Sequence, residues 1–249
     1  MHNAPAVEAI AETRRVLRDV PQIAVFDTAF HATIPTIATT YALPGEWRHD
    51  IRRYGFHGLS VQWSSEQVSA SRLVVCHLGG GCSVTAVRDG RSIDTTMGFT
   101  PLEGLPGATR SGSVDPGALL YLMRHGTPLS ELDRALDRDS GLAALGGLDD
   151  PLGFALFAYR VATAVGAMAV ALEGLDAVVF TAGIGENRAD VRAAVTARLR
   201  HLGVDLDETA NTDAVPDAEV AATGSRARVH VIRAREELIA ARHARHLLR

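Results

Sequence analysis

The sequence predicts an α/β fold, and three stretches carry this prediction. Apolar and β-branched runs at 73–78 and 83–87 predict two strands that are joined by a tight turn. An apolar strand at 177–182 runs toward a helix at about 189–201. A long apolar segment at 152–174 predicts a helix that is buried against these strands. Strands and covering helices that share one core are typical of α/β proteins.

The N-terminal part predicts one helix and one short strand. Residues Ala6–Asp19 mix apolar and charged side chains as a helix does, and Pro21 ends that helix. Gln22–Phe26 then predicts a short buried strand. Residues Thr33–Gly58 predict irregular structure, because prolines and glycines interrupt them.

The most informative stretch is Leu73–Thr95. Asp89-Gly90 is the usual signal of a type I′ hairpin turn, and a short strand at Ser92–Ile93 follows it. Three consecutive glycines, Gly79–Gly81, separate the first two strands, and such a turn lets backbone N–H groups converge on an anion. A P-loop would need Gly-Lys-Ser/Thr and a following helix, and both are absent. A plain hairpin turn without a ligand remains an equal alternative.

Residues Met97–Gly117 predict a long irregular segment that is rich in glycine and proline. Structureless segments of this length are uncommon unless they have a function. Pro116 then predicts the start of a helix at about Gly117–His125. Ser130 predicts the cap of another helix over Glu131–Asp137.

The C-terminal part contains a second glycine segment, Gly183–Asn187, between a strand and a helix. This arrangement is a common place for a nucleotide or a phosphate, although a plain turn is the more frequent alternative. Val229–Ile232 predicts a short strand. Arg235–Leu248 predicts an amphipathic terminal helix whose basic face is solvated.

Composition narrows the class of protein. The chain has 249 residues, enough for one large or two small domains, and its net charge of −4 argues against a nucleic-acid partner. All 25 basic residues are arginine, so any anion clamp must use guanidinium groups. Two cysteines and the lack of an apolar N-terminal signal region predict a reduced, cytoplasmic setting. The apolar segment at 152–174 is short for a membrane span, so no membrane association is expected.

Several motifs together resemble one family. The motifs are VFDTAFH at 25–31, RRYGFHG at 52–58, HLGGGCS at 77–83, MGFTPLEG at 97–104, TRSG at 109–112 with DPG at 115–117, FTAGIGEN at 180–187 and REELIA at 235–240. Their order and length resemble the acetate and propionate kinases over nearly the whole chain. The resemblance implies a ribonuclease-H-like fold of the sugar kinase, Hsp70 and actin superfamily. It divides the chain into a remnant of the N-terminal domain (1–26), a C-terminal nucleotide-binding domain (27–235) and a terminal helix (236–249).

The resemblance implies a phosphotransferase that converts ATP and acetate into ADP and acetyl phosphate with Mg²⁺. Arg110 would clamp the carboxylate and the transferring phosphoryl group, and the alternative is a loop arginine paired with Asp115. His57 would donate to a phosphoryl oxygen. Asp27 would orient Arg110 or hold Mg²⁺ through water, or would only cap the next turn.

The remaining site residues also follow from the resemblance. Glu236 would associate with Mg²⁺, and a solvated glutamate at a helix start is the alternative. Phe56 and Pro101 would line the pocket for the methyl group of acetate or for propionate. The predicted nucleotide contacts are His77, Leu78, Gly79, Gly80, Gly81, Gly183, Ile184, Gly185, Glu186 and Asn187. A homodimer is the expected assembly.

The resemblance further places His2-Asn3 inside the family's N-terminal half-domain, which predicts a chain impaired by truncation. Gly80 stands where the family usually has Asn, and Ser113 where Asp is common. The family's Asp-x-Arg motif has no match in Gly146–Gly153. One alternative is therefore a catalytically inactive nucleotide-binding or interaction protein. Another is a fragment of a longer protein that results from a misplaced start codon.

Overall fold

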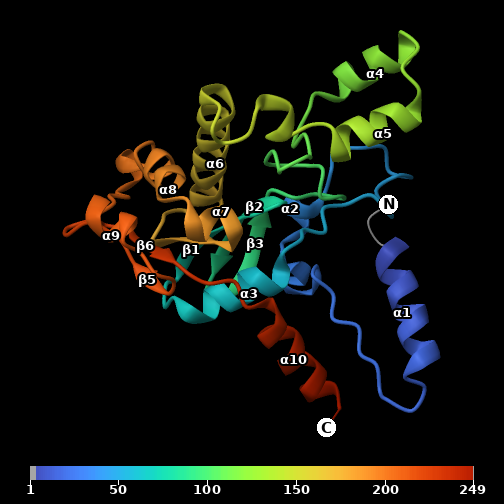
Figure 1. Cartoon of the computed structure of the whole chain (residues 1–249), viewed down its shortest axis with the longest axis horizontal. Coiled ribbons are helices and arrows are strands. Elements are labelled where there is room, and N and C mark those ends of the chain that lie inside the picture. Colours follow the sequence, from blue (N-terminus) through green and yellow to red (C-terminus); the bar gives the residue numbers. More distant parts are fainter. Residues whose placement is uncertain (1–3, 249) are drawn as a thin grey trace.

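A central mixed sheet organises the molecule, in a computed structural model that describes residues 4–248 (Figure 1). The expected match at His2-Asn3 lies outside the described residues. The strands are β1 (Arg72–Leu78), β2 (Cys82–Arg88), β3 (Arg91–Thr95), β4 (Ala177–Thr181), β5 (Ala218–Glu219) and β6 (Arg228–Val231). The sheet order is β3-β2-β1-β4-β6-β5. The β1–β4 and β4–β6 pairs are parallel, while β1–β2, β2–β3 and β5–β6 are antiparallel.

Helices cover both faces of this sheet. The helices are α1 (Ala4–Val16), α2 (Thr36–Thr39), α3 (Gly58–Gln67), α4 (Pro116–Arg124), α5 (Leu129–Arg138), α6 (Pro151–Ala171), α7 (Ala182–Asn187), α8 (Ala189–Thr196), α9 (Glu208–Thr212) and α10 (Glu236–Leu247). Short 3₁₀ turns span Ala29–Thr33, Ala143–Leu145 and Arg200–Leu202. Helices α6 and α8 lie on one face, and α3 and α10 lie on the other (Figure 1).

The alternation of side chains along the strands produces two cores. In β1, Val74 and Cys76 pack into the core beneath α6 and α8, whereas Leu73 and Val75 pack into the core beneath α3 and α10. Because both faces of the strand are buried, β1 is a nearly continuous apolar run, as is typical of strands with parallel neighbours. This explains why the central strands could be predicted from the sequence.

Helix α6 is the long apolar segment that the sequence predicts to be buried. Among the described helices it alone is long and apolar enough to cross a membrane, by length and composition. Its residues Phe157, Val161 and Val165 are fully buried against the sheet. A core helix passes the same test of length and composition, and the packing of α6 explains its hydropathy.

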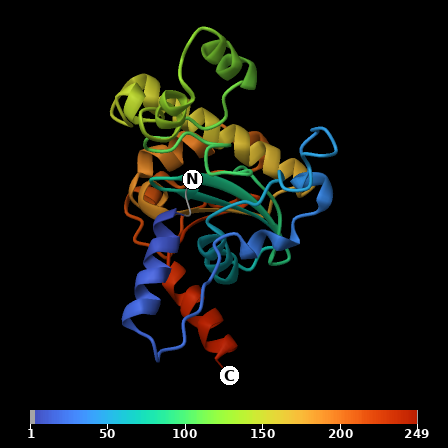
Figure 2. The same ribbon diagram turned by 90° about the vertical axis from the view of Figure 1, so that its right-hand side faces the viewer.

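The predicted strand at Gln22–Phe26 is wrong. These residues form no strand, and Phe26 is 68% exposed. The preceding helix, α1, is shorter than predicted and stands away from the sheet in both ribbon views (Figures 1 and 2). An apolar run needs a neighbouring strand to become part of a sheet, and this run has none.

The hairpin prediction is confirmed, and the helices that follow need one correction. Asp89 and Gly90 both have positive φ, at 50° and 74°, as a type I′ turn requires. Helix α4 begins at Pro116, and Asp115 caps it by accepting from the Gly117 N–H. Ser130, however, does not cap α5. This helix begins at Leu129, before Ser130, and Pro128 is the residue at its N-cap.

The second glycine segment also differs from the prediction. Residues Gly183–Asn187 belong to the short helix α7 rather than to an open turn, and α8 then ends at Thr196. Helix α3 was not predicted, because its start lies in a segment that reads as irregular. The predicted terminal helix is confirmed as α10, which begins at Glu236.

Candidate active site

Two glycine segments that are far apart in the sequence meet at one edge of the sheet. Strands β1 and β4 are parallel neighbours, so their carboxyl ends lie side by side. The turn Gly79–Gly81 follows β1, and α7 follows β4. A methyl group built on Gly79 would lie 3.5 Å from the Cβ atom of Ala182. In α/β sheets, the carboxyl ends of parallel strands are the usual place for a ligand.

The triglycine turn presents backbone donors. The Gly79 N–H donates to the Gly81 carbonyl at 3.1 Å, and the Gly80 carbonyl accepts from the Ala108 N–H at 2.9 Å. Within residues 4–248, the N–H groups of Gly80 and Gly81 make no hydrogen bond to the protein. These two groups can donate to an anion, which supports the ligand-binding interpretation of this turn.

Two side chains converge on Gly81. A methyl group built there would lie 3.1 Å from Arg110 Nη1 and 3.3 Å from His57 Nε2. Arg110 lies in the irregular segment before α4, and His57 is the residue directly before α3. The structure thus brings together a guanidinium, an imidazole and free backbone N–H groups, which is a suitable set of donors for a phosphoryl group.

The backbone around His57 is held by Asp27. His57 has a φ of 59°, a left-handed conformation that is uncommon for residues other than glycine. The Asp27 carboxylate accepts from the His57 N–H at 2.5 Å and from the Leu59 N–H at 3.4 Å. At Gly58, a Cβ atom would lie 2.2 Å from the Asp27 carbonyl oxygen, so only glycine fits. Asp27 therefore caps α3 and fixes the direction of His57.

His57 is half-buried and lies against the buried His77. Its ring stacks on the ring of His77 with centroids 3.9 Å apart, and its Nδ1 lies 3.0 Å from Ser83 Oγ. His77 Nδ1 in turn lies 2.8 Å from Ser60 Oγ. Burial lowers the pKa of His57 to about 4, with Arg110 adding to the effect and Asp27 opposing it. His57 is therefore neutral at neutral pH, and a neutral ring with Nε2 protonated can donate toward the Gly81 turn.

These histidines predict a pH-dependent stability. Burial lowers the pKa of His31, His57 and His77, so the unfolded chain binds more protons than the native chain between about pH 4 and pH 6.5. The free energy of unfolding should therefore fall as the pH falls through this window. Each unit of pKa difference corresponds to about 1.4 kcal/mol, so a loss of several degrees in melting temperature is expected. Urea or thermal unfolding at a series of pH values measures it.

A substitution at His57 tests how much this residue contributes to the pH dependence of stability. Asn tolerates the left-handed backbone and keeps a polar atom near Ser83, so His57→Asn should give a flatter pH profile. His49→Gln is the control, because His49 is exposed and lies outside the site. A His57→Asn profile as steep as that of the unchanged chain would show that His57 does not cause the dependence.

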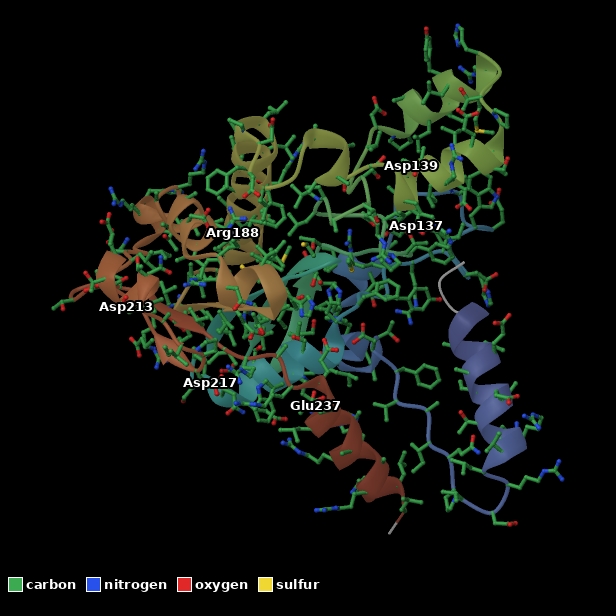
Figure 3. All side chains as sticks on the ribbon, in the orientation of Figure 1. Asp137, Asp139, Arg188, Asp213, Asp217 and Glu237 are labelled. Atoms are coloured by element: carbon green, nitrogen blue, oxygen red, sulfur yellow. The ribbon has the colours of Figure 1, made fainter. Side chains whose placement is uncertain are left out.

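Two further carboxylates, Glu236 and Glu237, begin α10, and the charge of Asp27 acts on Glu236. Burial raises the pKa of Glu236, and the charges of Asp27 and Glu237 raise it further. Glu237, at the start of α10, is labelled in Figure 3. A nearby cation would relieve this repulsion. No cluster of three metal-ligating side chains occurs among the described residues, so a cation here would need additional oxygen atoms from a ligand.

Arg110 is oriented by a residue that the sequence did not indicate. Its Nε donates to Asp137 Oδ1 at 3.0 Å. Both expected partners make other contacts: Asp27 binds the backbone of α3, and Asp115 caps α4. Asp137 lies 27 residues from Arg110, on helix α5, and no sequence pattern marks such a pair.

Helix α7 is fixed by one of its predicted ligand residues. Glu186 Oε1 accepts from the Ala182 N–H at 3.0 Å and from the Ala234 N–H at 2.9 Å. Asn187 donates to the Gly183 carbonyl at 2.8 Å. The Glu186 carboxylate thus connects α7 to the segment directly before α10. Glu236 is the first residue of α10. Gly183 is exposed beside this contact and remains open to a ligand.

Three other predicted residues have clear positions. Leu78 is fully buried, so only its backbone could face a nucleotide. Phe56 directly precedes His57, and Pro101 is buried in the loop 97–104. The Tyr54 N–H donates to the Gly98 carbonyl at 3.0 Å, which brings the two motifs together. Ser83, within the predicted HLGGGCS motif, is a contact of His57 that the sequence interpretation missed.

The family follows from comparison with known proteins. The profile of the acetokinase family matches residues 1–242. This chain belongs to the acetokinase family. It is 43% identical over 274 residues to the acetate kinase of Nostoc punctiforme, and the alignment covers 100% of this chain and 68% of that protein. The chain thus spans about two thirds of the length of that curated relative.

Solved acetokinase-family structures share the fold. The propionate kinase of Francisella tularensis superposes with a TM-score of 0.88 at 37% identity, covering 94% of this chain and 67% of the other. The acetate kinase of Porphyromonas gingivalis gives 0.88 at 30% identity, covering 98% and 68%. The predicted family and the predicted fold class are confirmed. The domain boundaries and the individual site residues stay predictions.

Proposed function

We propose that this acetokinase-family chain transfers the γ-phosphoryl group of ATP to acetate or propionate, reversibly. The observation that carries the proposal is the convergence of Arg110, His57 and the free N–H groups of Gly80 and Gly81 at the carboxyl end of β1. Phosphoryl transfer needs positioning and neutralisation of charge more than it needs a strong base. The carboxylate acceptor is already ionised at neutral pH.

In the forward step, a carboxylate oxygen attacks the γ-phosphorus, and the bond from that phosphorus to the bridging oxygen breaks. ADP leaves with the electron pair of the broken bond, and acyl phosphate forms. Arg110 would hold the carboxylate and the phosphoryl group with its free Nη atoms. Neutral His57 would donate from Nε2 to an equatorial phosphoryl oxygen as charge spreads over it. Gly79–Gly81 would hold the nucleotide phosphates, and Gly183–Asn187 would approach the adenosine.

Asp27 and Glu236 fit a magnesium ion that arrives with the nucleotide. Mg²⁺ commonly takes one or two protein carboxylates, and substrate phosphates and water supply the other ligands. The ion would neutralise charge on the phosphates. Burial raises the pKa of Glu236 most, and repulsion from Asp27 and Glu237 adds to it; a cation would remove this repulsion, which supports the assignment.

The acceptor would be a short carboxylic acid. Phe56 and Pro101 would line an apolar pocket for its alkyl group. One additional methylene group changes binding by only about 1–3 kcal/mol, so both acids are within range. We further propose a cytoplasmic homodimer. The four consecutive exposed apolar residues 120–123 on α4 are compatible with such an assembly.

A hydroxylamine trap tests the activity. The purified 249-residue chain is mixed with ATP, Mg²⁺ and acetate or propionate, and acyl phosphate is captured as the hydroxamate. We expect product that depends on all three components, at a rate below the roughly 1–100 s⁻¹ usual for kinases, since the chain spans two thirds of its relatives' length. Calorimetry with ATP and Mg²⁺ measures nucleotide binding separately. Absence of product with both acids would contradict the proposed function, whether or not the nucleotide binds.

A further inference from the structure

Asp137, near the C-terminal end of α5, contacts the side chain of Arg110. Arg110 Nε donates to Asp137 Oδ1 at 3.0 Å, and the two side chains are 28% and 30% exposed. The neighbouring Arg138 approaches Asp137 Oδ2 only to 3.9 Å and is 79% exposed. Arg110 is therefore the main partner of this carboxylate.

The residues on both sides of Arg110 are bound to the last turn of α5 and to the residues just after it. The Ser111 N–H donates to the Leu136 carbonyl at 3.0 Å, and Thr109 Oγ1 donates to the Asp137 carbonyl at 2.9 Å. The Thr109 carbonyl accepts from the Ser140 N–H at 3.0 Å. The last carbonyls of a helix have no partner within the helix, and here the loop supplies donors to two of them. The end of α5 is thus a platform for the Arg110 loop.

The Asp137 contact sets the direction of the guanidinium. It occupies Nε, and Nη1 lies beside Gly81 and His57 on the other side of the group. A long arginine side chain loses much rotamer freedom when it is held in one direction, and a partner must offset that loss. Backbone contacts of Thr109 and Ser111 fix the loop, but Asp137 is the side chain bonded to Arg110 itself.

We propose that Asp137 is a positioning residue that aims Arg110 at the reacting phosphoryl group. This inference rests on the proposed function, because it takes Arg110 as the residue that contacts the substrate. Asp137 itself acts only through Arg110. Its acceptor oxygen matters for direction, so an amide at the same position should preserve most of its effect.

Substitutions at two nearby aspartates test the proposal. We expect Asp137→Ala to lower kcat by about 10- to 100-fold, since a misplacement of about 1 Å in a catalytic group can cost this much. Asp137→Asn keeps an acceptor oxygen and should stay within about threefold of the unchanged chain. Asp139→Ala is the control. Asp139 lies on the same end of α5 and pairs with Arg134, with both side chains largely exposed (Figure 3). We expect no change in kcat for it.

A second measurement reports on position without catalysis. In ¹⁵N-labelled chain, the Arg110 Nε–H resonance is assigned by its disappearance in Arg110→Lys. It should be protected from solvent exchange in the unchanged chain and in Asp137→Asn, and exchange rapidly in Asp137→Ala. Where the unchanged chain transfers no phosphoryl group, the proposed function fails, and this resonance alone decides the role of Asp137.

Two results would overturn the proposal. One is an Asp137→Ala chain that retains the protected resonance and, where activity exists, normal kcat. The other is an Asp137→Asn chain that loses as much protection or kcat as Asp137→Ala, because the charge rather than the acceptor position would then matter. Melting temperatures of all variants, measured alongside, identify any loss that is due to unfolding.

Discussion

Replacing Arg110 with alanine should lower the kcat of phosphoryl transfer by about 10³-fold and leave the fold nearly intact. Its Nη1 is a charged donor at the Gly81 turn, and loss of one preorganised donor typically costs about 10²–10³ in kcat. Arg110 is expected to contact both the carboxylate and the phosphoryl group, so the loss should reach the upper end of this range. Its ion pair with Asp137 is partly exposed, so about 1 kcal/mol of stability is at stake.

Kinetics and melting temperatures measured on the same preparations separate the two roles of Arg110. Arg110→Lys retains charge but not the planar fork, and it should recover only part of the rate. Arg138→Ala is the matched control, because it removes an exposed cation beside Asp137 without approaching Gly81. An Arg110→Ala chain that melts several degrees lower but is fully active per folded molecule would assign Arg110 a structural role.

The sequence predicted the central strands well because their signals are local. In Leu73–Val87, both faces of the strands are buried, and Asp89-Gly90 encodes the turn in two residues. By contrast, Gln22–Phe26 has the composition of a strand but no neighbouring strand. Whether an apolar run is buried depends on the elements that pack against it, and the local sequence does not specify those elements.

The second glycine segment shows how distant contacts alter local structure. Two glycines among Gly183–Asn187 favour a turn, yet the segment is helical as α7. The Glu186 carboxylate binds the Ala182 N–H at the start of this helix and also the Ala234 N–H, 48 residues away. The second contact could not be read from the sequence. It helps to explain why helix rather than turn is the stable conformation.

The sequence predicted the residues of the candidate site but not the contact that orients Arg110. Motifs identified His57, Arg110 and Gly79–Gly81, and the structure brings all three together. The pairing of Arg110 with Asp137 depends on how α5 packs against the loop. Such a contact leaves no periodic signal, so the sequence offered the nearer Asp115 instead.

Arg192 is the other residue that only the structure reveals, and its replacement should destabilise the fold strongly. It is 2% exposed on α8, and burial lowers the pKa of its guanidinium. Nε and Nη2 donate to the side chain and carbonyl of Asn211, both at 2.7 Å. Nη1 donates to the carbonyls of Gly185 and Glu186, both at 2.9 Å. One side chain thus joins α8 to α9 and to the end of α7.

Arg192→Ala should therefore lower the free energy of unfolding by about 3 kcal/mol or more. It leaves several buried acceptors without a donor, at about 1–3 kcal/mol for each one that water does not reach, and it opens a cavity. Arg192→Met fills most of that volume but donates no hydrogen bond, so it should remain well below the unchanged chain. Urea unfolding measures both variants.

Arg198→Ala provides the control for this prediction. Arg198 follows α8 closely and is exposed, and within residues 4–248 its side chain donates one hydrogen bond, to the Ala194 carbonyl at 2.8 Å. Its loss should change stability by no more than about 0.5 kcal/mol. Buried ionic groups are sometimes replaced by apolar ones without loss, but that requires the partner groups to be replaced as well. The partners of Arg192 are mostly backbone carbonyls, which remain in every variant. Equal stability of Arg192→Met and the unchanged chain would therefore mean that these four hydrogen bonds contribute nothing net to folding.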